Sequence, residues 1–156
     1  MKNGSPQLTY FFGEEMANAF IKAFPSERKD EKLLLLPVPL TEKRAKERGY
    51  NQAELLGEVV GKELEKHGFS VEVRTDILTK RKDTAMQKHM NFTERTDNVS
   101  GAYHIAKRTL CKGQTVLLID DIMTTGATGT VCAKRLMGAG TKEVYLLVAT
   151  ALPERK

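Results

Sequence analysis

The sequence contains no tryptophan, only two cysteines and no long apolar run. The two cysteines, Cys111 and Cys132, lack the close paired spacing of a zinc site, which excludes a zinc ribbon and a disulfide-stapled mini-protein and favours reduced thiols. The longest apolar run, Leu33–Leu40, includes two prolines and is far shorter than the roughly 18 residues of a membrane-spanning helix. The first residues show no apolar stretch followed by a small-residue cleavage site. We therefore expect a cytoplasmic protein with no membrane span.

A chain of 156 residues, of which 40% are apolar and 29% charged, fits one globular domain. Its net charge of +5 is unevenly placed: residues 1–32 are neutral overall, whereas residues 33–156 hold 20 basic and 15 acidic side chains. We expect residues 1–32 to form a helix and a connector, and residues 33–156 to form the core domain. Basic side chains gather at 43–48 and 80–88, where they either attract phosphate or form a solvated surface.

Helical and strand periods alternate along the chain. The expected helices span residues 11–24, from Asn51 to Gly68, and from about Gly126 to Gly138 or Gly140. The expected strands span residues 33–38, 69–73, 115–119 and 143–149. This alternation predicts an α/β fold with a parallel sheet, helices on both faces and right-handed crossovers. Residues 78–106 are polar and cationic with few apolar anchors, which is typical of a functional lid.

The helix ends and faces can be predicted in more detail. Asn51 can cap its helix, with Glu54 three residues later, and Gly68 can end it. The residues expected to face the core from the first helix are Phe12, Met16, Ala19, Phe20, Ala23 and Phe24. Those expected to do so from the last helix are Val131, Cys132, Leu136 and Met137.

The segment Val116–Thr128 carries the strongest signal for chemistry. Its four apolar residues predict a buried strand that ends at two adjacent acids, Asp120 and Asp121. A turn rich in threonine then opens a helix, so that backbone N–H groups and hydroxyls meet at a helix N-terminus, which favours anion binding. Gly126 lets the backbone approach a phosphate closely. In open α/β sheets, ligands bind beyond the carboxyl ends of the strands, where this segment is expected to lie.

Two carboxylates beside an anion site restrict the ligand. They would repel a phosphate unless sugar hydroxyls donate to them or a divalent cation lies between the charges. The segment therefore predicts a ligand with a phosphate and a polyol, bound with Mg²⁺, and a phosphorylated ribose meets these demands. An acidic motif of a phosphate-loop NTPase is excluded, because the chain has no Gly-x-x-x-x-Gly-Lys-Ser/Thr loop. A capped helix with no ligand is the remaining alternative.

The segment Val116–Thr128 resembles the phosphoribosyl pyrophosphate (PRPP) motif of type I phosphoribosyltransferases. Over residues 33–150, about three-quarters of the chain, the sequence is similar more narrowly to the ComF family of competence-associated, phosphoribosyltransferase-like proteins. The blocks that carry this resemblance are Pro37–Leu40 with Arg48–Ala53, Arg81–Gln87 with Glu94–Tyr103, and Val116–Thr128 with its helix and last strand.

The resemblance implies a role for each matching residue. Asp120 and Asp121 would hold the ribose hydroxyls, directly or through Mg²⁺. The turn at 124–128 would wrap the 5′-phosphate with Thr124, Thr125, Gly126, Ala127 and Thr128. The turn after the first strand would bind pyrophosphate, which assigns Thr41, Glu42, Lys43, Arg44 and Arg48 to that group. Residues 80–98 would form a flexible loop over the active site, with Arg81 and Gln87 as its catalytic contacts.

Two function classes follow from the resemblance. One is a Mg²⁺-dependent transferase that moves the phosphoribosyl group of PRPP, or of a related ribose phosphate, to an unidentified acceptor. The other is a non-enzymatic protein that binds PRPP or a nucleotide and acts in DNA uptake or contacts DNA. Longer ComF relatives begin with a cysteine-rich zinc ribbon that this sequence lacks, so the chain is either a short variant or lacks its start. A homodimer is among the assemblies that the resemblance allows.

Overall fold

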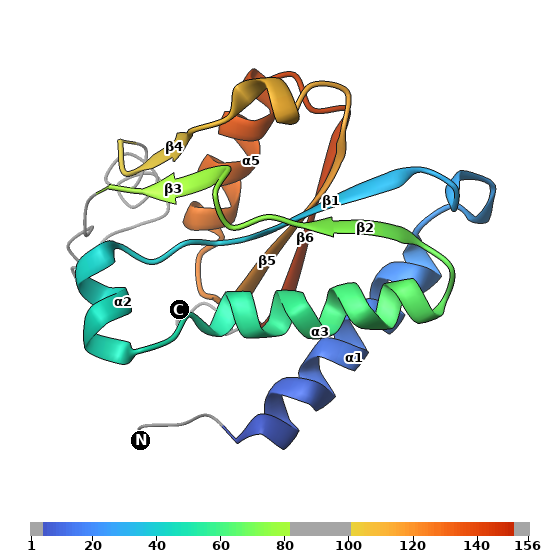
Figure 1. Ribbon diagram of the computed structural model, residues 1–156, viewed down its shortest axis with the longest axis horizontal. Helices are drawn as coiled ribbons and strands as arrows, with labels where there is room; N and C mark the ends of the chain where they lie inside the picture. The colour runs from blue at the N-terminus through green and yellow to red at the C-terminus, as the bar shows by residue number, and fades with distance from the viewer. Residues whose placement is uncertain (1–4, 82–100, 152–156) are drawn as a thin grey trace.

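The computed structural model describes residues 5–81 and 101–151. The α-helices within these residues are α1 (Pro6–Ala23), α2 (Glu42–Arg48), α3 (Gln52–Lys66) and α5 (Ala127–Gly138). The strands are β1 (Lys32–Pro37), β2 (Ser70–Val73), β3 (Leu78–Lys80), β4 (Tyr103–Ile105), β5 (Thr115–Met123) and β6 (Glu143–Ala151). Two short 3₁₀ helices, η1 (Ser26–Arg28) and η2 (Arg108–Leu110), complete the described elements (Figure 1).

The main sheet has four strands in the order β2-β1-β5-β6, and every neighbouring pair is parallel. Its two central strands, β1 and β5, contain the runs of consecutive leucine, valine and isoleucine, and Leu33–Leu36 and Val116–Ile119 are buried on both faces. This burial is the reason why these strands show no polar alternation in the sequence. The predicted parallel α/β sheet is therefore confirmed.

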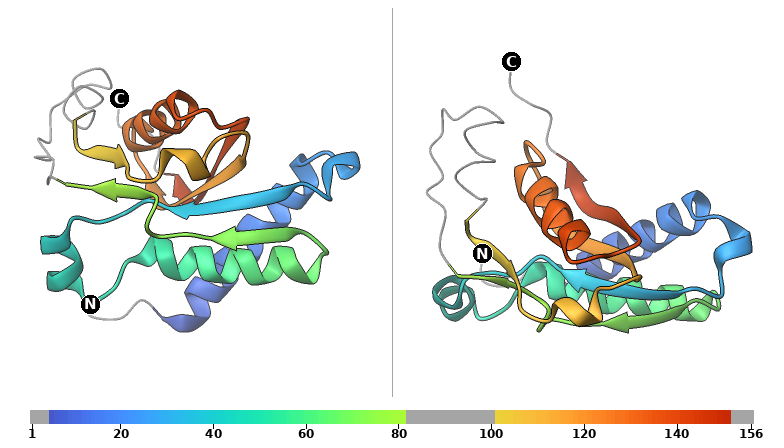
Figure 2. Two further views of the ribbon diagram at one scale, coloured as in Figure 1. Left: turned by 45° about the horizontal axis from the view of Figure 1, so that its top comes forward. Right: turned by 90° about the horizontal axis from the view of Figure 1, so that it is seen from above.

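Helices cover both faces of the sheet, as the alternation of elements predicts. One face packs against α1 and α3, with Leu33, Leu35 and Leu117 in the same buried cluster as Phe20 and Leu56. The opposite face packs against α5 and the antiparallel pair β3–β4 (Figure 2). The sheet therefore has one apolar core on each face, which is the layered architecture of α/β domains.

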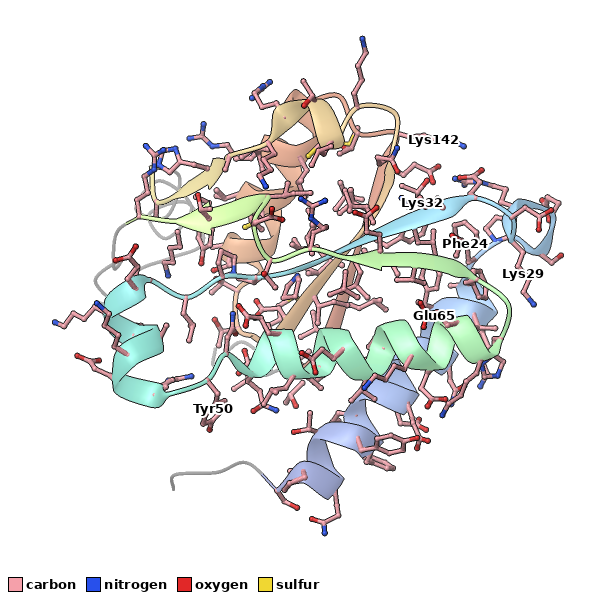
Figure 3. All side chains as sticks on the ribbon, in the orientation of Figure 1. Phe24, Lys29, Lys32, Tyr50, Glu65 and Lys142 are labelled. Atoms are coloured by element: carbon pink, nitrogen blue, oxygen red, sulfur yellow. The ribbon has the colours of Figure 1, made fainter. Side chains whose placement is uncertain are left out.

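Helix α1 begins at Pro6, five residues before the expected start at residue 11. Of its expected inward residues, Met16 and Phe20 are buried but Ala19 and Ala23 are exposed. Phe20 and Phe24 form an aromatic cluster with Phe69 and Tyr145, and Phe24 lies between α1 and the sheet (Figure 3). The buried face of α1 instead includes Thr9, Gly13 and Ala17, so the helix is rotated relative to the prediction.

The predicted caps of α3 are confirmed. The Asn51 side chain accepts a hydrogen bond from the backbone N–H of Ala53 at 3.0 Å and donates one to Glu54 at 3.3 Å. Gly68 follows the helix with a φ of 83°, in the left-handed region that favours glycine. Asn51 also donates to the carbonyl of Val38 at 3.1 Å, so the same residue fixes α3 against the end of β1.

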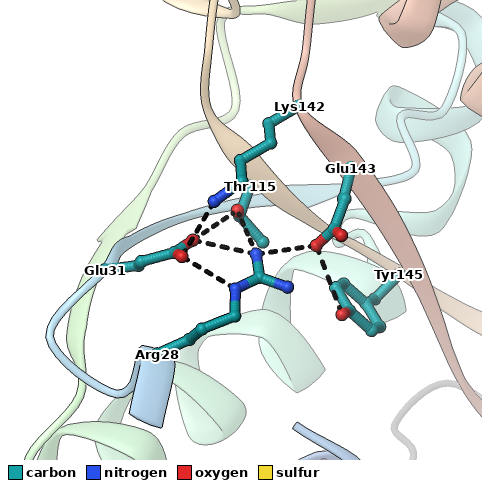
Figure 4. A network of polar contacts seen from close by, with 6 residues as sticks. All are labelled: Arg28, Glu31, Thr115, Lys142, Glu143 and Tyr145. Carbon is teal, nitrogen blue, oxygen red and sulfur yellow. Dashed lines mark hydrogen bonds and ion pairs between the residues drawn. The ribbon is translucent and has the colours of Figure 1, made fainter. Parts of the chain in front are cut away.

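A polar network joins the connector before β1 to the amino ends of β5 and β6 (Figure 4). Arg28 donates to Glu31 at 2.7 and 2.9 Å and to Glu143 at 2.8 Å. Thr115 donates to Glu31 at 3.1 Å, and Lys142 donates to the same carboxylate at 2.8 Å. Hydrogen bonds from Arg28 hold the pKa of Glu31 well below its usual value. The network joins residues on both sides of the predicted domain boundary at residue 32. The boundary itself stays a prediction.

Two details of the C-terminal half differ from the sequence prediction. Strand β5 continues to Met123 instead of ending at Ile119, because β6 continues beside it to Ala151 and keeps it paired. Met137, expected to face the core, is 50% exposed at the end of α5, whereas Val131, Cys132 and Leu136 are buried as predicted. None of the helices in the two described ranges is long and apolar enough to cross a membrane.

Candidate phosphate and ribose site

The acid pair lies where β5 continues beyond its neighbour β1. Pro37 of β1 pairs with Ile119, the last residue of β5 in that ladder, whereas Asp120 pairs with Val148 of β6. One edge of β5 therefore loses its strand neighbour at the position where the acids begin. The acids lie inside a strand and not after it, which corrects the predicted end of the strand. They still lie at the carboxyl end of the sheet, where ligands bind in open α/β folds.

Asp120 is the more perturbed of the two acids. Its Oδ1 accepts the backbone N–H of Asp121 at 2.9 Å, and the Oδ1 of Asp121 accepts the N–H of Ile122 at 3.0 Å. Burial, with the negative charge of Asp121, raises the pKa of Asp120 to about 7, and the nearby Lys80 ammonium opposes this shift. Within residues 5–81 and 101–151, neither carboxylate forms an ion pair with an arginine. One oxygen of each carboxylate thus accepts a backbone amide of the same strand.

The turn after β5 forms the start of α5. Gly126 is the N-cap residue of this helix. Its φ of 75° lies in the left-handed region, which glycine adopts more readily than any residue with a Cβ. The Oγ1 of Thr125 accepts the N–H of Ala127 at 3.4 Å, and Thr128 lies partly exposed in the first helical turn. Thr124 is exposed. Backbone N–H groups and threonine hydroxyls thus meet at a helix N-terminus, the arrangement that favours a phosphate.

The residues predicted to bind pyrophosphate lie on or next to α2, a short helix that the sequence analysis treated as a turn. Thr41 caps it by accepting the N–H of Arg44 at 3.3 Å, and Gly49 ends it with a φ of 77°. Helix α2 follows the carboxyl end of β1, on the side of the molecule where β3 ends (Figures 1 and 2). Arg44 is half-buried, and its charge opposes the rise that burial causes in the pKa of Tyr103 on β4. Glu42, Lys43 and Arg48 are exposed on the same helix.

Three residues beside Asp120 were not predicted as site residues. Lys80 on β3 pairs directly with Tyr103 on β4, and its Nζ lies 5.1 Å from the centre of the tyrosine ring. Tyr103 is 2% exposed, and burial raises its pKa above the usual value. Burial, with the charge of Asp120, raises the pKa of the Cys132 thiol to about 12. The sequence held a separate signal for each member: Lys80 belongs to the basic residues at 80–88, Tyr103 begins the apolar anchor Tyr103-His-Ile105, and Cys132 was expected to face the core.

The predicted loop contacts are only partly within the described residues. Arg81 directly follows β3, is exposed, and donates its backbone N–H to the carbonyl of Ala102 at 3.0 Å. Gln87 and the rest of the predicted loop lie outside the described residues. Arg81 is therefore placed at the base of that segment, and its catalytic role stays a prediction.

The acid pair suits a magnesium ion that is also held by a ligand. In the described part of the chain, no three histidine, cysteine, aspartate or glutamate side chains gather as a metal site. Mg²⁺ prefers oxygen ligands, and proteins commonly hold it with one or two carboxylates together with water and substrate phosphate. Asp120 and Asp121 supply two such carboxylates next to the anion-binding turn. The two carboxylates thus suit Mg²⁺ only if a bound phosphate supplies further oxygen ligands to the ion.

Comparisons with known sequences point to one group of proteins. No protein-family model matches the chain. It is 30% identical over 137 residues to competence protein ComFC of Bacillus subtilis, covering 88% of this chain and 50% of that protein. It is 31% identical over 113 residues to competence protein F of Haemophilus influenzae, covering 72% and 47%. It is 29% identical over 118 residues to DNA utilization protein YhgH of Salmonella typhi, covering 74% and 49%. The chain thus spans about half the length of these relatives.

Comparisons with solved structures concern the fold alone. The hypoxanthine phosphoribosyl transferase of Trypanosoma cruzi superposes with a TM-score of 0.60 at 10% identity, covering 96% of this chain and 76% of that one. The hypoxanthine phosphoribosyltransferase of Staphylococcus aureus gives a TM-score of 0.56 at 11% identity, covering 96% and 76%. The predicted type I phosphoribosyltransferase fold is therefore confirmed.

Proposed function

We propose, from the premise that the chain belongs to the ComF family of competence-associated, phosphoribosyltransferase-like proteins, that it binds PRPP together with Mg²⁺ at residues 120–128. The observation that carries the proposal is the continuity of the site: a strand with two carboxylates runs directly into a glycine-initiated helix N-terminus. This brings acceptors for sugar hydroxyls and donors for a phosphate together within nine residues. The fold supports the same choice, because solved structures with this fold include phosphoribosyltransferases.

The backbone at the start of α5 would bind the 5′-phosphate. The N–H groups of a helix N-terminus carry partial positive charge, and the left-handed backbone at Gly126 leaves them uncovered by a Cβ. Thr124, Thr125 and Thr128 would add hydroxyl donors. Asp120 and Asp121 would accept from the ribose 2′- and 3′-hydroxyls. Mg²⁺, when bound, would neutralise part of the negative charge that the carboxylates and the phosphates bring together.

The reaction that we propose is displacement of pyrophosphate from the anomeric carbon by a nitrogen nucleophile. The new C–N bond forms as the C–O bond to pyrophosphate breaks, and pyrophosphate leaves with the electron pair while the nucleophile releases its proton to solvent. Cations from α2, above all Arg44 and Lys43, would stabilise the negative charge on the leaving group. No side chain is needed as a nucleophile in this scheme.

A second candidate is PRPP binding without turnover, in a protein that serves DNA uptake. The names of the relatives, which refer to competence and DNA utilization, favour it. Basic side chains on α2 and at the end of β3 could then contact DNA. Direct DNA binding predicts an affinity that falls steeply with rising salt concentration, because bound cations displace counterions from the phosphates.

Calorimetric titration with PRPP tests the binding site. We expect the native protein to bind PRPP more tightly with Mg²⁺ than with EDTA, and the double variant Asp120→Asn/Asp121→Asn to bind at least about tenfold more weakly. The matched control is Glu27→Gln/Asp30→Asn, which removes two exposed carboxylates from the connector before β1. Equal heats for the native protein and the Asp120/Asp121 variant would count against the proposal.

Pyrophosphate release separates the two candidates. The native protein is incubated with PRPP, Mg²⁺ and a panel of nucleobases and amines, and pyrophosphate is measured. Release that depends on one acceptor supports the transferase. PRPP binding without release, for any acceptor of the panel, favours the binding protein.

A further inference from the structure

Residues 39–50 form a loop whose two ends are joined by one hydrogen bond. The loop leaves the end of β1 after Val38, contains α2, and reaches the start of α3 at Asn51 (Figure 1). The Nδ2 of Asn51 donates to the carbonyl oxygen of Val38 at 3.1 Å. Bringing the ends of a loop together costs conformational entropy, so a bond across the ends stabilises the closed form of the loop.

The end of the loop at Val38 is itself fixed next to the acid pair. Prolines precede and follow Val38, and a residue before proline is restricted to extended backbone. The N–H of Val38 donates to the carbonyl of Ile119 at 2.8 Å, and Ile119 directly precedes Asp120. Asn51 therefore attaches the loop to the backbone that lies beside the proposed ribose site.

The placement of α2 depends on how the ends of this loop are held. None of the seven residues of α2 is buried, and a helix this short is not stable by itself in water. Its start is capped by Thr41, and its end lies at Gly49, close to Asn51 in the chain. Because α2 has no buried face of its own, closure of the loop helps to set where Lys43 and Arg44 lie relative to Asp120.

Asn51 has more hydrogen-bonding groups than a helix cap requires. Its Oδ1 caps α3 by accepting the N–H of Ala53 at 3.0 Å. Aspartate and serine also supply a capping oxygen, but an ionised aspartate has no donor and the serine side chain is shorter. The amide nitrogen is thus not needed for the cap, whereas the bond to Val38 depends on it.

We infer that Asn51 is a positioning residue, which closes the loop of residues 39–50 and so holds the cations of α2 toward the pyrophosphate of PRPP. The inference rests on the proposed function, in which Lys43 and Arg44 stabilise that group. Asn51 acts on the ligand through these two cations. Because ribose 5-phosphate has no pyrophosphate, the closed loop contributes to the affinity for PRPP and not to that for ribose 5-phosphate.

The test is calorimetric titration of Asn51→Asp with PRPP and with ribose 5-phosphate, each in the presence of Mg²⁺. This variant keeps the cap of α3 and loses the donor to Val38. We expect it to bind PRPP about 5- to 10-fold more weakly than the native protein, and ribose 5-phosphate with an unchanged affinity. Loss of the cap alone would weaken the fold and lower both affinities, so the contrast between the two ligands separates positioning from a structural role.

Two further variants separate the lost donor from the added charge. Gln52→Glu is the matched control, because it makes the same change from amide to carboxylate at the next residue, whose Nε2 donates to Thr9 of α1 at 2.9 Å. It should bind both ligands as the native protein does. Asn51→Ser is uncharged and keeps a capping oxygen, and it should lose PRPP affinity as Asn51→Asp does. A loss in Asn51→Asp alone would show an effect of charge and would overturn the inference.

A double-mutant cycle tests whether Asn51 acts through α2. The variant Lys43→Gln/Arg44→Gln should weaken PRPP binding, and addition of Asn51→Ser should cause no further loss. Losses that add, equal losses for both ligands, or native PRPP affinity in the Asn51 variants would overturn the inference. Native PRPP affinity in Lys43→Gln/Arg44→Gln would overturn the assignment of pyrophosphate to α2, and the inference with it. Failure of the native protein to bind either ligand would instead overturn the proposed function.

Discussion

Asp120 illustrates how a residue of the proposed site can oppose the stability of its own fold. Its carboxylate lies at the end of a buried strand, next to a second carboxylate, and burial with that neighbour raises the pKa of Asp120 to about 7. An unfolded aspartate has a pKa of about 3.9. Between these two values the folded protein retains a proton that the unfolded chain has released, so the free energy of unfolding falls as the pH rises through this window.

We predict that Asp120→Asn raises the free energy of unfolding at pH 8 by about 1–2 kcal/mol, because the charge that is costly to bury is removed while Oδ1 can still accept the N–H of Asp121. At pH 4 the difference should vanish, since the native carboxyl is then neutral. Urea unfolding of both proteins at the two pH values measures this. The exposed Asp30→Asn serves as the control, and a variant that is less stable than the native protein at pH 8 would contradict the account.

Gly126 is the second residue whose identity follows from its place in the site. Its φ of 75° is strained for any residue with a Cβ, although a Cβ would meet only the sulfur of Met123 at 3.7 Å. We expect Gly126→Ala to lower the free energy of unfolding by about 1–2 kcal/mol and to weaken PRPP binding. The matched change Gly138→Ala, at a position with open space and no positive φ, should be neutral or slightly stabilising. Thermal unfolding and calorimetry of both variants measure the contrast, and equal effects would refute the argument.

At the scale of elements, the packing of α1 on α3 depends on a close approach that only glycine permits. A Cβ at Gly13 would lie 2.4 Å from Cγ1 and 2.6 Å from Cβ of Val59. The second of these atoms is attached to the backbone of α3 and cannot rotate away. At Gly129 a Cβ would lie 2.5 Å from Cδ2 of Leu146, which is the end of a side chain that is 37% exposed. An added Cβ would thus meet its neighbour at a similar distance at both glycines. The two positions differ because the side chain of Leu146 can move away and the Cβ of Val59 cannot.

We predict that Gly13→Ala lowers the free energy of unfolding by about 1–3 kcal/mol, since the helices must separate or shift to accept the methyl group. Gly129→Ala should cost less, because Leu146 can change rotamer into solvent. Combining Gly13→Ala with Val59→Ala should recover part of the loss. Denaturant unfolding of the three variants tests this order, and an equal or larger cost at Gly129 would contradict it.

The elements also show what could be predicted from the sequence. The central strands and the two caps of α3 were predictable because continuous apolar runs, Asn51 and Gly68 each have a local cause. The extension of β5 through Asp120 and Asp121 was not, since its pairing with β6 is a tertiary contact. Helix α2 was missed because its seven residues bury no apolar face and are held by the cap at Thr41. Tyr103 and Lys80 were missed as site residues because they reach Asp120 only through the sheet topology.

At the scale of the whole molecule, the carboxyl end of the sheet gathers the groups that a phosphoribosyl ligand requires. The acids come from β5, the anion-binding turn from α5, and Arg44 from α2. The opposite end of the sheet is closed by the network of Arg28, Glu31 and Glu143 (Figure 4). The two ends thus differ: one carries ion pairs that join the connector to the strands, and the other carries the acid pair and the turn that we propose as the ligand site.

The most direct test of this account is a crystal structure of the protein with PRPP and Mg²⁺. The account predicts the 5′-phosphate against the backbone N–H groups of residues 124–128 and the ribose hydroxyls within hydrogen-bond distance of Asp120 and Asp121. Electron density for PRPP at another place, or solvent alone at this turn with the two aspartates paired to arginines, would contradict it.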